Sequence, residues 1–172
     1  MRPNLRLWRQ RWRRYRALRP ADRRLYHRVW CLLLRIRVEL IVLPYATWRA
    51  RWLDRVGPAL ASLRGDPDAV ERVAWSVRHA SRFIPGSRTC LVQALAAYQL
   101  LRPLGIPVDI EIGARFDDRG QLRAHAWVTV LGRVVVGAED AEAAQRDYQR
   151  LGALDPATPD TDRDPPTRSA GL

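Results

Sequence analysis

The hydrophobic and polar positions change their period near residue 105, and this change predicts the fold class. Before it, apolar residues recur at helical spacing, which predicts helices over about 21–43, 45–56, 67–83 and 90–102. After it, apolar and polar residues alternate, which predicts strands over about 108–114, 122–130 and 134–136. A further short helix is expected within 140–152. Helices followed by an antiparallel meander predict an α+β fold, in which a helical N-terminal half packs on a small antiparallel sheet.

The composition changes along the chain and divides it into three regions. Residues 1–66 are rich in arginine and show helical patterns, and residues 67–152 hold the mixed helix and strand patterns. Residues 153–172 are rich in proline, aspartate and threonine and lack periodicity, so we expect a disordered tail. At 172 residues, one domain with an appended segment is expected.

The positive charge is concentrated in the N-terminal third. Residues 1–55 carry 16 arginines against three acidic residues, a net of +13, whereas residues 56–172 carry 14 arginines against 15 acidic residues, a net of −1. These charges are either solvated helix faces or a surface for an anionic partner, which would be an acidic protein or peptide, a membrane surface or nucleic acid.

Two cysteines do not make a disulfide framework, so a reducing cytoplasm is the expected compartment. Cys31 lies in an apolar run and is expected to be a buried, small hydrophobic residue. The first residues do not resemble a signal peptide. The apolar run over 29–48 contains Arg35, Arg37 and Glu39 near its middle, which predicts a buried or interfacial helix rather than a membrane span.

Cys90 and His125 are the candidate catalytic residues. Cys90 follows a loop-forming stretch that ends in Ser87 and Thr89, either of which could cap the next helix, so its thiol is expected in the first helical turn. The N–H groups and the positive dipole end there favour a thiolate and could receive an oxyanion. His125 alternates with Trp127 along a predicted strand, as expected for an imidazole that lines a cleft. His27 and His79 are most simply surface residues.

A cysteine–histidine pair generally needs a third group that orients the imidazole. If Leu131-Gly132 is a two-residue turn, His125 faces Ala138 and Asp140 lies diagonally on the same face. A bulged turn shifts the register by one residue and brings Glu139 into reach instead. The sequence leaves both alternatives open.

Three motifs together resemble one known family. Cys90-Leu91-Val92-Gln93-Ala94-Leu95, Leu104-Gly105-Ile106-Pro107 and His125-Ala126-Trp127-Val128 resemble the stand-alone transglutaminase-like cysteine proteases of lasso-peptide biosynthesis. The resemblance is strongest over about 67–138. It implies a papain-like protease core within 67–152, with Cys90 as nucleophile, His125 as base, and Gln93 and Trp127 as support for the site. The family's aspartate position holds Gly137, so Glu139, Asp140 or a dyad would have to serve.

The resemblance also implies an activity and a set of partners. The activity is removal of the leader from a ribosomally made lasso-peptide precursor. The implied partners are that precursor, a separate leader-recognition protein and the lasso cyclase. The histidines and cysteines show no zinc spacing, and we expect neither a metal nor another cofactor.

Three other interpretations of the sequence stay open. The arginines and tryptophans of residues 1–55 could bind nucleic acid or an anionic membrane, although no recognised nucleic-acid motif is present. The fold could also serve as a non-catalytic transglutaminase-like scaffold.

Overall fold

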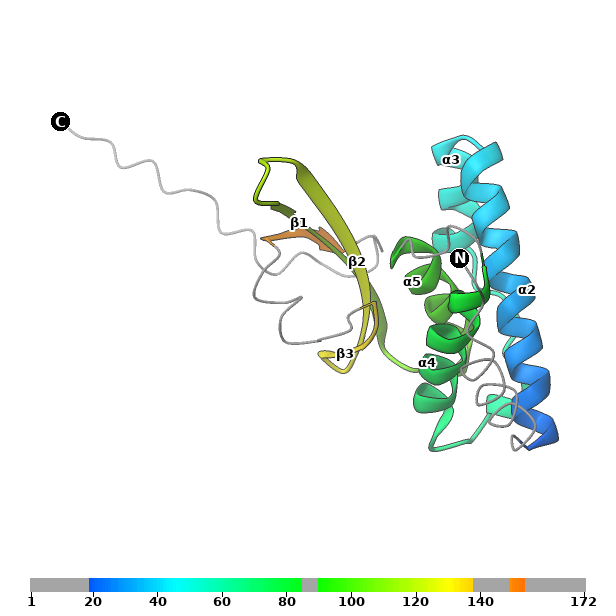
Figure 1. Ribbon diagram of the computed structural model, residues 1–172. Coiled ribbons are helices and arrows are strands. Elements are labelled where there is room, and N and C mark those ends of the chain that lie inside the picture. The colour runs from blue at the N-terminus through cyan, green and yellow to red at the C-terminus, as the bar shows by residue number, and fades with distance from the viewer. Residues whose placement is uncertain (1–18, 85–89, 138–148, 154–172) are drawn as a thin grey trace, which may run out of the picture.

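The computed structural model describes residues 19–84, 90–137 and 149–153 (Figure 1). The long helix α2 (Pro20–Val42) comes first and begins with proline in its first turn. The helices that follow are α3 (Tyr45–Arg49), a π-helical turn (Ala50–Asp54), α4 (Ala69–Ala80) and α5 (Cys90–Leu101). Short 3-10 turns lie at Ala61–Leu63, Ser81–Phe83 and Arg102–Leu104.

The strands form one antiparallel sheet in the order β3-β2-β1-β4. They are β1 (Val108–Phe116), β2 (Leu122–Val130), β3 (Arg133–Val136) and β4 (Gln149–Ala153). A two-residue turn joins β2 to β3, and both of its residues, Leu131 and Gly132, have positive φ angles, as tight hairpin turns of this hand require. A register shift between Val128 and Thr129 then moves the end of β3 relative to β2.

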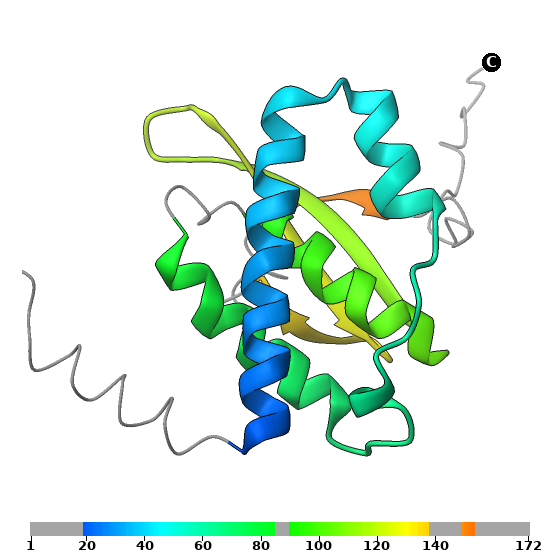
Figure 2. The ribbon, with the colours of Figure 1, turned by 90° about the vertical axis from the view of Figure 1, so that its right-hand side faces the viewer.

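Helix α5 lies at the centre of the molecule, between the sheet and the other helices (Figures 1 and 2). Most of its side chains are buried, as expected of a helix that is apolar on nearly all sides. On one side it packs against β1 and β2, whose buried residues include Ile110 and Val128. On the other it packs against α2 and α4. The helical half and the sheet therefore share one hydrophobic core. Packing within this core holds α5, including its first turn, against the sheet.

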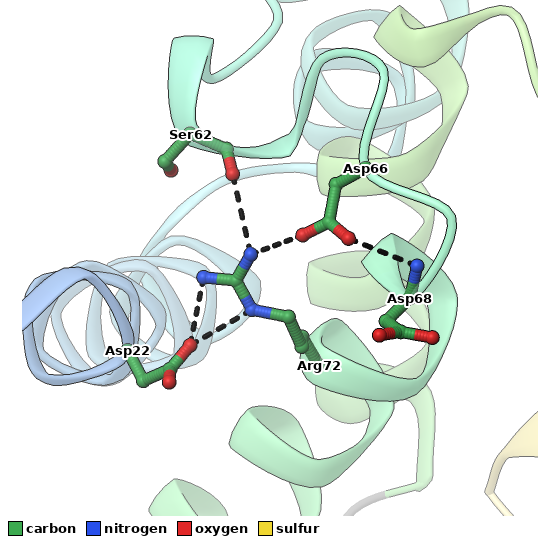
Figure 3. A network of polar contacts seen from close by, with 5 residues as sticks. All are labelled: Asp22, Ser62, Asp66, Asp68 and Arg72. Carbon is green, nitrogen blue, oxygen red and sulfur yellow. Dashed lines mark hydrogen bonds and ion pairs between the residues drawn. The ribbon is translucent and has the colours of Figure 1, made fainter. Parts of the chain in front are cut away.

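Arg72 joins three segments on the helical side (Figure 3). Its guanidinium donates to Asp22 on α2 at 2.8 Å, to the carbonyl oxygen of Ser62 at 3.3 Å, and to Asp66 before α4. Asp66 in turn accepts a hydrogen bond of 2.9 Å from the main-chain N–H of Asp68. These contacts hold α2 and the 61–66 segment against the start of α4.

The structure confirms the predicted α+β class. The helices lie close to their predicted positions, and β2 has the predicted bounds. The expected helix within 140–152 is wrong at its end, because residues 149–153 form β4 and pair with β1; residues 140–148 lie outside the described part. No helix in the described ranges combines the length and apolar character that crossing a bilayer requires.

The burial predicted for Cys31 is also wrong. Its side chain is exposed, because it lies on the side of α2 away from the residues that enter the core. The buried side of that helix consists of Leu25, Val29, Leu33 and Ile36.

Candidate active site

Cys90 is the first residue of α5, so its thiol lies where the helix has main-chain N–H groups without partners inside the helix. The residue is partly buried. The main-chain N–H groups of Ala126 on β2 and of Leu91 hydrogen-bond the sulfur. These donors favour a negatively charged sulfur and form the kind of environment that stabilises an oxyanion. Ser87 and Thr89, the candidate caps, lie outside the described residues.

His125 lies on β2, opposite Gly113 of β1, and is partly buried. Its imidazole shares a hydrogen bond with the Cys90 sulfur. The fold creates this contact because α5 packs along β2 and brings its first turn to the middle of that strand. The two residues that sequence analysis selected are therefore brought together from separate elements.

Both groups have shifted pKa values. Burial raises the pKa of the Cys90 thiol, but the hydrogen bond with His125, the N–H of Ala126 and the charge of His125 outweigh this effect and lower it. The hydrogen bond with Cys90 raises the pKa of His125, and burial opposes this rise only in part. The two shifts favour the same state, a thiolate paired with an imidazolium, which is the reactive form of a nucleophilic cysteine.

The second nitrogen of the imidazole contacts the main chain. Nε2 of His125 donates to the carbonyl oxygen of Gly137, directly after β3. This leaves Nδ1 as the ring nitrogen available to the Cys90 sulfur. Glu139 and Asp140, the predicted candidates for the third member, lie outside the described residues. The two-residue turn is followed by a bulge in the ladder, so the simple register that favoured Asp140 does not continue through β3.

The comparison with protein families agrees with this geometry. The family model described as the transglutaminase-like superfamily matches residues 30–152, which is more than half of the chain. The chain belongs to the transglutaminase-like superfamily. Comparisons with curated proteins and with solved structures gave no significant match. The superfamily includes cysteine peptidase-like enzymes, and the cysteine–histidine pair described above supplies the groups that such chemistry needs.

Trp127 is a buried residue that lies next to His125 in this transglutaminase-like site. Its side chain is fully buried, and its ring stacks beside that of His125 with centroids 6.1 Å apart. Its indole Nε1 has no hydrogen-bond partner among the described residues. On the same face of the sheet, the hydroxyl of Thr129 donates to Glu111 at 3.1 Å. Trp127 therefore places a buried aromatic ring beside the imidazole.

The other predicted residues have less defined roles in the structure. Gln93 is partly buried on α5, one helical turn after Cys90, and its supporting role stays a prediction. His27 is exposed, as expected. His79 is partly buried, and its ring stacks on that of Trp75 with centroids 4.1 Å apart. Nδ1 of His79 donates a hydrogen bond to the main-chain carbonyl oxygen of Trp75. Within the described ranges, no group of three or more histidine, cysteine or acidic residues could hold a metal ion.

The main-chain contributors to the site are not predictable from the sequence. The carbonyl of Gly137 contacts His125 and the N–H of Ala126 contacts Cys90, but main-chain groups leave no residue-type signature. Arg115 on β1, whose charge lowers the pKa of His125, was missed as well. The one available signal was the glycine itself, which occupies the position where the proteases that the sequence resembles have their aspartate.

Proposed function

We propose that this transglutaminase-like protein is a cysteine peptidase that removes the leader from a lasso-peptide precursor. The observation that carries the peptidase activity is the hydrogen-bonded pair of Cys90 and His125 at the start of a buried helix, with pKa shifts that favour the ion pair. The substrate class rests on the motifs around Cys90, Gly105 and His125, which resemble those of the lasso-peptide leader peptidases.

The proposed reaction proceeds in two stages. The Cys90 thiolate attacks the carbonyl carbon at the junction of leader and core, and main-chain N–H groups stabilise the oxyanion. The tetrahedral intermediate collapses as the carbon–nitrogen bond breaks and the His125 imidazolium gives its proton to the leaving amine. Water then adds to the thioester while His125 takes its proton, and the sulfur leaves as thiolate. The net reaction is hydrolysis of one peptide bond, without any other co-reactant.

The two cysteines allow a matched test. Precursor peptide and recognition protein are incubated with wild type, Cys90→Ala or Cys31→Ala, and leader release is followed by mass spectrometry. The Cys90 variant should lose roughly 10⁴-fold or more in rate, as other enzymes do without their nucleophile. With the recognition protein at saturating concentration, so that a change in its affinity does not limit the rate, the Cys31 variant should keep the wild-type rate, since Cys31 lies on the exposed side of α2 and not at the start of α5. Cleavage by the Cys90 variant at the wild-type rate would overturn the proposal.

We also propose that the leader-recognition protein docks on the exposed face of α2. Apolar side chains recur there at helical spacing, opposite the face that enters the core: Trp30, Leu34, Val38, Ile41 and, in α3, Tyr45. Exposed arginines flank them along α2 at Arg24, Arg28 and Arg35. Such a face fits a protein with an apolar centre and an acidic rim, because apolar contacts supply affinity and opposite charges supply orientation.

The docking face can be tested separately from catalysis. Ile41 is 68% exposed, so Ile41→Asp should abolish binding of the recognition protein in calorimetry without unfolding the chain. Phe116→Asp, at a site that is 73% exposed on the β1–β2 hairpin, is the control and should bind normally. Equal affinities for both variants would overturn this assignment. Binding of wild type to anionic vesicles that is lost in Ile41→Asp, with recognition-protein affinity unchanged, would assign the face to a membrane.

A further inference from the structure

Gly137 lies where the chain leaves β3, and no other residue fits its place. Its φ angle is +106°, in a region that side-chain-bearing residues rarely adopt. A Cβ atom there would lie 2.6 Å from the carbonyl oxygen of Ala126 and 2.7 Å from the Cα atom of Trp127. Both obstructing atoms belong to the backbone of β2, so they cannot turn away as a flexible side chain could. Glycine is therefore required here by conformation and by space.

This close approach has a consequence for the candidate active site. Ala126 and Trp127 directly follow His125, so a chain that touches their backbone also lies within reach of the imidazole. The carbonyl oxygen of Gly137 accepts the hydrogen bond of Nε2. A carbonyl can only accept, so this contact selects the tautomer with its proton on Nε2 and leaves Nδ1 for the Cys90 sulfur.

We propose that the main-chain carbonyl of Gly137 is the group that orients His125 in this enzyme, the part that a carboxylate plays in the related proteases. The inference rests on the proposed function of the Cys90–His125 pair. Gly137 is a positioning residue, since it acts through His125 rather than on the substrate. At the family's aspartate position, a main-chain carbonyl then replaces the carboxylate as the hydrogen-bond acceptor. The site still consists of three groups: the Cys90 thiol, the His125 imidazole and this carbonyl.

A neutral acceptor predicts a particular pH dependence. Among the described residues, the groups that act on the pKa of His125 are Cys90 from α5, which raises it, and Arg115 from β1, which lowers it. The Gly137 carbonyl raises it as well. Loss of the carbonyl should therefore lower the pKa of His125, and the imidazolium would be lost at a lower pH. The alkaline limb of the activity profile should move to lower pH.

A matched pair of glycine variants tests this. Gly137→Ala should push the chain away from β2 and lower kcat/KM for precursor cleavage on the order of 10²-fold, with the alkaline limb moved to lower pH. Gly132→Ala is the control, because Gly132 also has a positive φ of +76° but has nothing within 4 Å of its Cβ position and no contact with His125. It should keep the wild-type rate and profile. Equal profiles for the two variants would overturn the inference.

Two further measurements keep the test decisive. If Gly137→Ala does not fold, nitrogen-15 NMR of histidine in Cys90→Ala reports the tautomer directly: a proton on Nε2 supports the inference, and a proton on Nδ1 overturns it.

Glu139→Gln and Asp140→Asn should each cleave the precursor within a few-fold of wild type. A loss in either comparable to that of His125→Ala would assign the orienting role to that carboxylate. Cleavage by Cys90→Ala would instead refute the proposed function.

Discussion

Replacing Trp127 by phenylalanine should leave the stability of the protein almost unchanged, whereas replacing it by alanine should destabilise it strongly. The indole is fully buried beside His125, and its N–H has no hydrogen-bond partner among the described residues. Phenylalanine keeps an aromatic ring next to the imidazole and removes that N–H. Alanine removes the ring altogether.

The magnitudes follow from two opposing effects. Phenylalanine lacks two of the indole's ring carbons, which at about 0.8 kcal/mol per buried carbon lowers the free energy of unfolding by about 1.5 kcal/mol. It also removes a buried N–H that has no partner among the described residues, and a buried N–H left unpaired costs about 1–3 kcal/mol. The two effects oppose each other, and the net change should stay within about 1.5 kcal/mol of zero. Alanine leaves a cavity and should cost about 3–5 kcal/mol.

Urea unfolding of wild type and both variants measures these changes, provided that the m-values agree. Trp75→Phe, at a partly buried tryptophan on α4, is the control for a simple loss of ring size. If Trp127→Phe were as unstable as Trp127→Ala, the indole N–H would have a hydrogen-bond partner, and the description of the site's buried face would be wrong.

Two further predictions concern the helical half. Arg72→Met should lower the urea midpoint more than Arg78→Met, an exposed position on the same helix, because it leaves Asp22 and Asp66 without their shared cation. Glu39→Gln should make stability less dependent on pH. Burial raises the pKa of Glu39, but hydrogen bonds from Arg35 and Arg51 outweigh this and lower it. Because the pKa of Glu39 is lower in the folded than in the unfolded state, its ionised form stabilises the fold at pH values above the unfolded-state pKa. This stabilisation is lost as the pH falls through the folded-state pKa. Acidification to about pH 3 should therefore destabilise the wild type more than the variant. Glu71→Gln, exposed on α4, should behave as wild type; equal responses in each pair would contradict these two predictions.

Local patterns in the sequence predicted the elements well because each pattern has a local physical cause. The alternation around Ile110 and Val128 reflects one face of a sheet that packs on helices, and the apolar positions of α5 reflect burial on nearly all sides. The adjacency of Cys90 and His125 was inferred from residue chemistry and family resemblance. The structure adds the reason for it, which is the packing of α5 along β2.

Tertiary context decided what the local patterns did not. Cys31 is surrounded by apolar neighbours in the sequence, but the rotation of α2 turns it to the solvent. The helical interpretation of residues 149–153 failed because pairing with β1 at the sheet edge overrides local propensity. The orienting contact at Gly137 comes from a main-chain group, which any residue type carries, so only the three-dimensional approach of the chain to β2 reveals it.

The most direct test of the central claim is the alkylation rate of Cys90 as a function of pH. Iodoacetamide reacts with thiolates, and Cys31→Ser removes the exposed second thiol from the measurement. We expect Cys90 to react at a pH below that of an ordinary thiol, because its pKa is lowered, and His125→Ala to move the profile to higher pH, because burial would then act without the hydrogen bond and charge of the imidazole. Superimposable profiles for the two proteins would show that Cys90 and His125 do not form a reactive pair.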